Sequence, residues 1–193
     1  MGRGLSTRII GGKYRGRKIA LPDKEITRSS KGILREALFN ILQFDIVDKN
    51  FVEVFGGSGS VGLEALSRGA KRVYFIEKNP QAYDVLKKNC QLFDPDRCTI
   101  RFGDAFQILE EIVEELQREG EKAYFYFDPP FQIREGFEEI YDQLIEAIEK
   151  IPKEVVEAII VEHMSRVELP EEIGDFRSYK RRKFGKSTLT FYR

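Results

Sequence analysis

Residues 51–62, Phe-Val-Glu-Val-Phe-Gly-Gly-Ser-Gly-Ser-Val-Gly, decide the fold of this chain. The apolar run 51–55 predicts a strand, which passes directly into a glycine-rich loop that opens a helix reaching Ser67. Glycines let the chain turn sharply and let a ligand approach the backbone, and the first turn of the helix supplies N–H donors. Because many doubly wound proteins contain such a loop, the loop by itself is weak evidence for a particular ligand.

Strand and helical patterns alternate along the rest of the chain. Strands are predicted at 72–76, 99–102, 123–127 and 155–161, and helices at 31–43, from Pro80, at 105–118 and at 135–150. The first of these helices is predicted to place five apolar residues on one face: Ile33, Leu34, Leu38, Ile41 and Leu42. Strands separated by amphipathic helices indicate βαβ units and a parallel sheet that is covered on both faces. The sequence therefore predicts an α/β protein.

The two ends of the chain depart from this alternation. Residues 176–184 and 188–192 flank a Gly-Lys-Ser turn, a pattern that predicts an antiparallel hairpin. Residues 8–19 resemble two short strands around a Gly-rich turn. The predicted fold is thus a seven-stranded, mostly parallel sheet with an antiparallel C-terminal edge hairpin and a small N-terminal β-hairpin.

Acidic residues end three of the predicted strands. Glu77 ends the second strand, eighteen residues after Gly59, where a carboxylate can bind both hydroxyls of a ribose. Asp104 ends the third strand, within reach of an adenine edge, and Asp128 ends the fourth. Each has an ordinary alternative, Glu77 as a solvated strand end and Asp104 as a helix N-cap. Their coincidence with the glycine loop at the carboxyl ends of one sheet favours a ligand site.

Asp128 also opens the tetrapeptide Asp-Pro-Pro-Phe at residues 128–131. Two consecutive prolines lack N–H donors and fix φ, so the backbone leaves the sheet as a rigid, extended segment. The carbonyls of Asp128 and Pro129 can then accept hydrogen bonds, and Phe131 offers a flat face. Such a segment could hold a planar base through its exocyclic amine, although an ordinary Pro-rich turn is the alternative for an isolated Asp-Pro-Pro.

Composition bounds the class of protein. A chain of 193 residues with 41% hydrophobic residues fits one globular domain. Without an apolar run of about 20 residues or a signal-peptide core, we expect a cytoplasmic protein with no membrane contact. We interpret Cys90 and Cys98 as reduced, structural thiols, and the lone His163 as a satisfied residue at a strand end rather than a metal ligand.

Charge is segregated along the chain although the formal net charge is zero. Residues 1–35 hold ten basic and two acidic residues, while 104–162 hold seventeen acidic and five basic ones. The last fourteen residues, from Lys180, hold six basic residues and no acidic one. Basic termini suit a polyanion, although a solvated basic arm is the alternative. We expect residues 1–30 to form a basic extension and residues 31–193 a single domain. The expected RNA-binding side chains are Lys13, Arg15, Arg17, Lys18 and Arg28.

The order of these motifs resembles a known family. Glycine loop, strand-end acid, Gly-Asp-Ala at 103–105 and Asp-Pro-Pro-Phe are similar to the class I S-adenosylmethionine-dependent methyltransferases. Residues 8–18, 35–40, 57–70 and 185–186 are similar to the RsmD-type 16S rRNA guanine-N2 methyltransferases, over nearly the whole chain. The resemblance implies a Rossmann-like fold, the cofactor S-adenosyl-L-methionine and the product S-adenosyl-L-homocysteine.

The resemblance also implies roles for particular residues. It places the target amine against Asp128, Pro129, Pro130 and Phe131. It places the cofactor against Glu53, Phe55, Gly57, Ser58, Gly59, Glu77, Lys78, Asp104 and Ala105. The implied partner is 16S rRNA in a partially assembled small ribosomal subunit, bound by a monomer that needs no metal. The chain departs from the family pattern at Glu53, where Asp is usual, at Gly56, where Ala is usual, and in the segment 28–35.

Other functions remain open at this stage. A DNA or RNA adenine-N6 methyltransferase uses the same Asp-Pro-Pro-aromatic motif, and a small-molecule or protein amide methyltransferase would share the cofactor. An NAD-dependent oxidoreductase could use the glycine loop and Glu77, but it would not explain Asp128. A non-catalytic rRNA-binding assembly factor would explain the basic termini alone.

Overall fold

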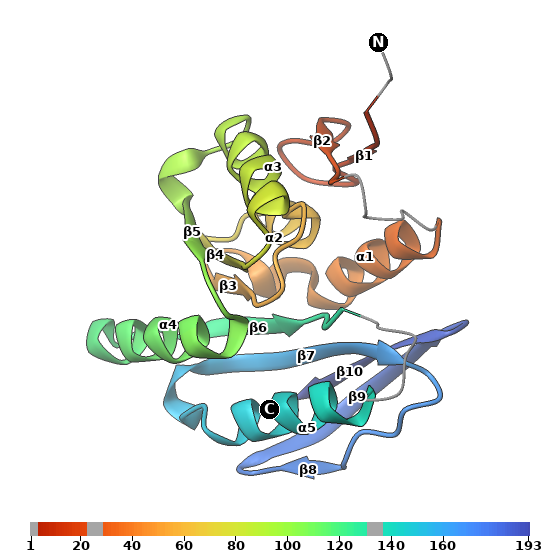
Figure 1. Cartoon of the computed structure of the whole chain (residues 1–193), viewed down its shortest axis with the longest axis vertical. Helices are drawn as coiled ribbons and strands as arrows, with labels where there is room; N and C mark the ends of the chain where they lie inside the picture. The colour runs from red at the N-terminus through yellow and green to blue at the C-terminus, as the bar shows by residue number, and fades with distance from the viewer. Residues whose placement is uncertain (1–3, 23–28, 131–136) are drawn as a thin grey trace. The chain divides into compact units, whose positions relative to one another are not determined.

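A computed structural model of the chain describes residues 4–22, 29–130 and 137–193. The chain divides into two compact units, with the boundary after Ala105 (Figure 1). Each unit is described in turn.

The part of the first unit that the structure describes contains a group of three parallel strands. The strand β4 (Arg72–Glu77) pairs on one side with β3 (Asn50–Glu53) and on the other with β5 (Cys98–Phe102). All four residues of β3 and the middle four of β4 are buried, as expected for strands covered on both faces. These strands end near the glycine loop. The apolar residues that bury the strands therefore also determine where the loop lies.

The described residues of the same unit also form three α-helices and two 3₁₀ helices. They are α1 (Ser29–Leu42), η1 (Gln43–Ile46), α2 (Ser60–Ser67), α3 (Pro80–Gln91) and η2 (Pro95–Arg97). The start of α3 follows from the sequence, because Pro80 suits the first turn and the Asn79 side chain accepts the N–H of Ala82 at 3.0 Å. In α1 the spacing places Leu34, Leu38 and Leu42 in the core.

The N-terminal hairpin lies against α2 and α3 (Figure 1). Its strands β1 (Ser6–Arg8) and β2 (Lys18–Ala20) are antiparallel, as predicted for residues 8–19, although each is only three residues long. The turn docks on the end of α2, where the Ser67 carbonyl accepts the N–H of Lys13 at 2.8 Å. A Cβ at Gly12, which has a φ of +80°, would lie 2.0 Å from the Ser67 carbonyl oxygen, so only glycine allows this approach.

A buried carboxylate holds the hairpin in place. Glu64 of α2 has no exposed surface, and its two oxygens accept the N–H groups of Ile10 at 2.8 Å and Gly11 at 3.0 Å. The same oxygens lie 3.3 Å from Nε of Arg35 and 3.0 Å from Nε of Arg68. The carboxylate therefore joins α1, α2 and the hairpin through two cations and two backbone donors.

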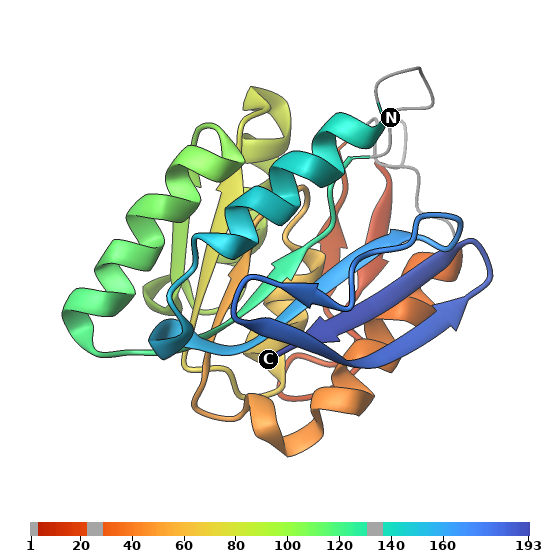
Figure 2. The same ribbon diagram turned by 90° about the horizontal axis from the view of Figure 1, so that it is seen from below.

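The second unit combines parallel and antiparallel strands. β6 (Ala123–Phe127) and β7 (Val156–Met164) are parallel, and β10 (Ser187–Tyr192) is antiparallel to both β7 and β9 (Phe176–Phe184). A two-residue strand, β8 (Glu172–Ile173), pairs with β9 and was not predicted. The helices are α4 (Ala105–Glu119), α5 (Phe137–Glu149) and the short η3 (Lys153–Val155). Figure 2 shows the antiparallel strands beside β7.

Most predicted elements appear with small shifts at their ends. The first strand ends at Glu53 instead of Phe55, because the chain turns into the glycine loop two residues earlier than the apolar run suggests. β7 extends to Met164, because Ser187 of β10 pairs with that residue. Ile33, expected on the apolar face of its helix, is 57% exposed, because the core positions follow the i, i+4 spacing from Leu34.

The structure confirms the interpretation of His163. The side chain is buried, with Nε2 2.8 Å from the Thr190 hydroxyl and Nδ1 3.0 Å from the Met164 carbonyl. Burial lowers the pKa of His163. Each ring nitrogen of His163 therefore has a hydrogen-bond partner within the protein. The two cysteines are free thiols, and the hydrogen bond with Cys98, together with burial, raises the pKa of Cys90.

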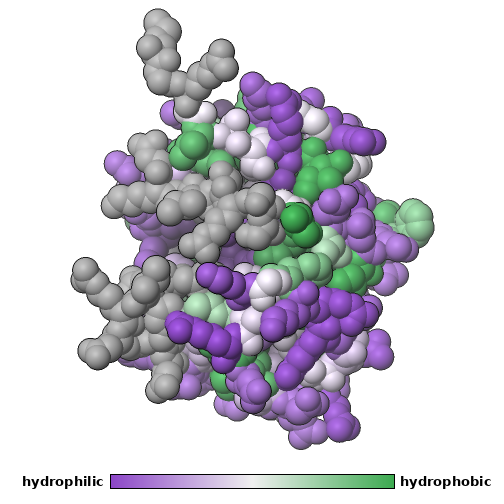
Figure 3. All heavy atoms as spheres, turned by 90° about the vertical axis from the view of Figure 1, so that its right-hand side faces the viewer, coloured by the Kyte–Doolittle hydropathy of each residue, from purple (hydrophilic) through white to green (hydrophobic). Residues whose placement is uncertain are grey.

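The surface is mainly hydrophilic where it can be seen. On the face shown in Figure 3, hydrophilic side chains cover most of the described surface, and hydrophobic ones form several smaller areas between them. None of the described helices is both long enough and apolar enough to span a membrane.

We expect Glu64→Ala to lower the free energy of unfolding by roughly 3–5 kcal/mol, because removal of one partner leaves a buried charge without compensation. In this variant Arg35 would be the buried charge that has lost its partner carboxylate. The N–H groups of Ile10 and Gly11 in the hairpin would also lose their acceptor. Urea unfolding followed by circular dichroism measures this change. The control is Glu36→Ala, an exposed acid on α1, which should change stability by less than about 0.5 kcal/mol. Equal stabilities of the two variants would contradict the assigned role.

Candidate functional site

The glycine loop between β3 and α2 has a shape that only glycine accommodates at two of its positions. Gly57 and Gly59 have φ values of 54° and 82°, in the left-handed region. A Cβ at Gly59 would lie 2.6 Å from Cδ1 of Leu86 in α3. The Gly59 N–H donates to the Gly56 carbonyl at 2.8 Å, which closes the turn before α2 begins.

The first turn of α2 lies directly against β4. A Cβ at Gly62 would lie 2.4 Å from the Phe75 ring, so the helix approaches the strand more closely than any side chain would permit. The Gly62 N–H donates to Oε2 of Glu53 at 2.6 Å. Glu53 is 3% exposed, and its carboxylate therefore anchors the start of α2 to the end of β3. A contact between Glu53 and the cofactor stays a prediction.

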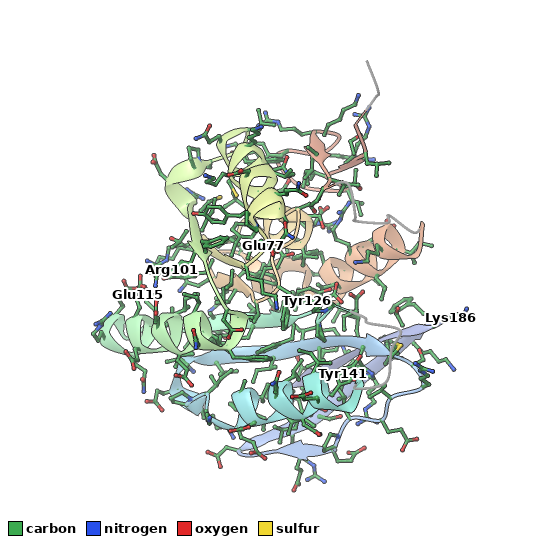
Figure 4. All side chains as sticks on the ribbon, viewed as in Figure 1. Glu77, Arg101, Glu115, Tyr126, Tyr141 and Lys186 are labelled. Atoms are coloured by element: carbon green, nitrogen blue, oxygen red, sulfur yellow. The ribbon has the colours of Figure 1, made fainter. Side chains whose placement is uncertain are left out.

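Glu77 holds the glycine loop through its carboxylate (Figure 4). Its Oε2 accepts the N–H of Gly57 at 2.8 Å, and its Oε1 accepts those of Lys78 at 2.9 Å and Asn79 at 2.8 Å. An ionised carboxylate offers about four lone-pair positions, so Glu77 retains capacity for one further donor. The loop-holding role was not predicted, although an acid directly before the Asn-Pro start of a helix is the signal that could have indicated it.

The end of β5 lies beside the end of β4. Phe102 is in register with Glu77, and the N–H of Gly103 donates to the Glu77 carbonyl at 3.1 Å. Asp104 is exposed and directly precedes α4, whose first residue, Ala105, is buried. The structure thereby brings the acids predicted for the ribose and for the adenine to neighbouring strand ends.

The remaining predicted cofactor residues differ in exposure. Lys78 is exposed, Phe55 is half-buried, and Ser58 is 1% exposed. The Ser58 carbonyl accepts a hydrogen bond from Nδ2 of Asn89 at 2.8 Å. Asn89 was not predicted, because a single polar residue near the end of an amphipathic helix has no distinguishing sequence signal.

In the second unit, Asp128 follows the fully buried strand β6. Asp128 is half-buried, Pro129 is buried and Pro130 is exposed, whereas Phe131 lies outside the described residues. Tyr141 of α5, labelled in Figure 4, is a neighbour that the sequence did not indicate. Burial raises the pKa of Tyr141, and the nearby Asp128 carboxylate adds to this shift. The Tyr141 hydroxyl accepts the N–H of Met164 at 3.4 Å, which ties α5 to the end of β7.

The predicted RNA-binding residues of the hairpin fall into two kinds. Lys13, Arg15 and Lys18 are exposed on the hairpin. Arg17 is also exposed, but its guanidinium lies 4.6 Å from the Tyr14 ring centroid and donates to the Leu92 carbonyl. Arg17 therefore contributes to docking of the hairpin, and Arg28 lies outside the described residues.

Two further features of the described residues bear on the site. A groove of about 440 Å³ lies between α4 and α5, and none of the predicted site residues lines it. No group of three histidine, cysteine, aspartate or glutamate side chains within 4–22, 29–130 and 137–193 could hold a metal ion.

Known proteins resemble the chain along most of its length. The family model described as Conserved hypothetical protein 95 matches residues 7–193. Ribosomal RNA small subunit methyltransferase D of Escherichia coli (strain K12) is 38% identical over 126 residues, 65% of this chain and 60% of that protein. The chain thus matches about three fifths of the length of this curated relative. The putative rRNA methyltransferase YlbH of Bacillus subtilis (strain 168) is 26% identical over 188 residues, 96% of this chain and 98% of that protein.

A solved structure supports the same relationship. The putative methyltransferase yhhF from Escherichia coli has a TM-score of 0.78 and 29% identity, and the likeness covers 97% of both chains. It confirms the predicted Rossmann-like class I methyltransferase fold, with mainly parallel strands and antiparallel C-terminal strands. Because the family model matches nearly the whole chain, this protein belongs to the family described as Conserved hypothetical protein 95, the RsmD family.

Proposed function

We propose that this protein transfers a methyl group from S-adenosyl-L-methionine to the exocyclic N2 amine of a guanine in 16S rRNA. The observation that carries the proposal is the intact Asp128-Pro129-Pro130 segment at the end of β6, in a chain whose glycine loop is held by Glu77. Membership of the RsmD family supports the same reaction.

The residues of the first unit fit the proposed cofactor. The left-handed conformations of Gly57 and Gly59 leave the loop backbone without side chains that would block a ligand. Glu77, already oriented by three N–H groups, can accept one more hydrogen bond from a ribose hydroxyl. Asp104 would accept a hydrogen bond from the adenine amine, and Ala105 would lie against the ring. When bound, S-adenosyl-L-methionine supplies an electrophilic methyl group and leaves as S-adenosyl-L-homocysteine.

The Asp-Pro-Pro segment would act on the target amine. The lone pair of an exocyclic amine is delocalised into the base, so the nitrogen is a poor nucleophile. Hydrogen bonds from the amine to the Asp128 carboxylate and the Pro129 carbonyl would direct the lone pair outward and stabilise the positive charge that develops on nitrogen. Phe131 would stack on the base, with a contribution of about 1–3 kcal/mol.

The proposed substrate is RNA within a partially assembled small subunit. The exposed basic side chains of Lys13, Arg15 and Lys18 would bind phosphates of the RNA. Such contacts position the substrate without reading its sequence. A guanine must be unstacked to reach Asp128, so an accessible loop is favoured over a duplex. The monomeric state, the cytoplasmic location and the independence of metal stay predictions from the sequence.

The proposed function is tested by offering the enzyme three substrates with labelled cofactor: naked 16S rRNA, partially assembled small subunits and duplex DNA. We expect N2-methylguanine at one site, formed best on the partially assembled subunits, with nucleoside mass spectrometry as the measurement. N6-methyladenine in DNA as the main product would favour the adenine-N6 alternative. Absence of transfer to any substrate, despite RNA binding, would favour the non-catalytic assembly factor.

Glu77→Ala should weaken S-adenosyl-L-homocysteine binding by roughly 10- to 100-fold, because hydrogen bonds to a charged group contribute about 1.5–3 kcal/mol. Titration calorimetry of the purified protein measures the change. Asp84→Ala is the matched control, since Asp84 is an exposed acid on α3 that pairs with Lys87. A wild-type protein that binds NAD and not S-adenosyl-L-homocysteine would refute the cofactor assignment.

Asp128→Asn should reduce turnover by roughly 100-fold or more while the affinity for S-adenosyl-L-homocysteine stays within about twofold. The reason is that Asp128 is assigned to the target amine and Asn keeps the size of the side chain without its charge. Single-turnover methylation and calorimetry separate the two effects. Asp142→Asn, an exposed position on α5, is the control, and near wild-type turnover of Asp128→Asn would show that the carboxylate is not needed.

A further inference from the structure

One buried side chain connects the N-terminal hairpin to the glycine loop. Asn89, near the end of α3, is 1% exposed. Its Oδ1 accepts the N–H of Ala20 at 2.9 Å, and its Nδ2 donates to the carbonyls of Ala20 and Ser58, both at 2.8 Å. The amide acceptor and both amide donors are therefore used by two chain segments outside α3.

On the loop side, Asn89 orients a peptide group next to the Glu77 contact. A peptide unit is planar, so the Ser58 carbonyl and the Gly59 N–H point in opposite directions. Asn89 holds the carbonyl, and the Gly56 carbonyl accepts the N–H at 2.8 Å. Since Glu77 holds the N–H of Gly57, consecutive loop residues are fixed by two different side chains.

On the hairpin side, Asn89 binds both backbone groups of Ala20 in β2. Ala20 lies two residues after Lys18, an exposed basic residue that is proposed to bind an RNA phosphate. The hairpin is also fixed near the end of α3, where Arg17 lies over the ring of Phe93, with Cζ 5.4 Å from its centroid. A shift of β2 would therefore change the hydrogen bonds of Asn89, and through them the position of the Ser58 carbonyl.

A role limited to filling the core does not account for these contacts. An apolar side chain of similar size would fill the volume, but it would remove the hydrogen bonds that Asn89 makes with the backbone of Ser58 and Ala20. The bond to the Ser58 carbonyl is buried, and loss of a buried hydrogen bond is destabilising. The specific feature is that one amide satisfies both segments at once, so neither can move independently of the other.

We propose that Asn89 is a positioning residue that couples the hairpin to the glycine loop, so that RNA on the hairpin and S-adenosyl-L-methionine in the loop strengthen each other's binding. This inference rests on the proposed function, because it assigns the two ligands to these two segments. The coupling is reciprocal by thermodynamic necessity, so it can be measured from either ligand. The path is the contiguous series of hydrogen bonds from Ala20 through Asn89 to Ser58.

The test measures the dissociation constant of S-adenosyl-L-homocysteine by calorimetry, with and without a saturating 16S rRNA transcript. The ratio of the two constants is the coupling factor. We expect a factor of about five or more for the wild-type protein, and a factor near one for Asn89→Ala. Asn50→Ala is the matched control, because Asn50 is equally buried but lies at the start of β3, and its coupling factor should equal that of the wild type.

A second variant reaches the same contact from the hairpin. Ala20→Pro removes the N–H that donates to Oδ1 of Asn89 and places the proline ring where that N–H was, so the contact is broken from the hairpin side while the residue at position 89 is kept. Its coupling factor should fall below half of the wild-type value, whereas Ala20→Ser, which keeps the N–H, should retain that value. A third variant, in which Lys13, Arg15 and Lys18 are replaced by Gln, tests whether RNA binds the hairpin. The slope of log K for RNA binding against log salt concentration should decrease in magnitude by about 0.7–0.9 for each lost phosphate contact.

The outcomes separate the inference from the function on which it rests. Binding of both ligands by the wild-type protein with a coupling factor of one would overturn the coupling and leave the proposed function standing. A wild-type factor that persists in Asn89→Ala or in Ala20→Pro would remove Asn89 from the path. Absence of S-adenosyl-L-homocysteine binding would overturn the proposed function and the inference together.

Discussion

The buried carboxylate of Glu64 is the interaction on which the first unit most depends. A fully desolvated charge is tolerated only when cations and donors surround it, and here Arg35, Arg68 and two backbone N–H groups do so. Because these partners come from α1, from the residue that directly follows α2 and from the hairpin, the requirement to satisfy one carboxylate fixes three segments together. The hairpin backbone between β1 and β2 is consequently docked on the unit, while Lys13, Arg15 and Lys18 stay exposed on it.

The same chemistry recurs at the candidate site. Glu53 accepts the Gly62 N–H, and Glu77 accepts those of Gly57, Lys78 and Asn79, so carboxylates at two strand ends hold the backbone of the loop and of α3. Donors and acceptors that are already oriented need little rearrangement when a ligand binds. The acids that the motif order assigned to a ligand therefore also build the surface that would receive it.

Much of the fold follows from local sequence patterns. Strand β6 was predicted with its observed bounds, since five apolar residues end at Asp-Pro-Pro, and Pro80 marks the start of α3 because proline suits the first turn of a helix. The short β8 was not predicted, because a two-residue strand has no periodicity and forms only where β9 offers a partner. Ile33 was wrongly predicted to face the core, because α2 and the hairpin determine which face of α1 is buried. The periodicity of α1 alone does not show where these neighbours lie.

The sequence by itself determined the α/β class, the glycine loop and the order of acids at the strand ends, because these depend on residue type and on spacing along the chain. Only the tertiary structure decided which side chains join distant segments. Glu64 and Asn89 each bind backbone groups more than fifty residues away in the hairpin. Arg17, predicted to bind RNA, also stacks on Tyr14 and Phe93. The residue types along the chain do not indicate which backbone N–H and carbonyl groups a distant side chain will bind. Such contacts can therefore be identified only in the folded structure.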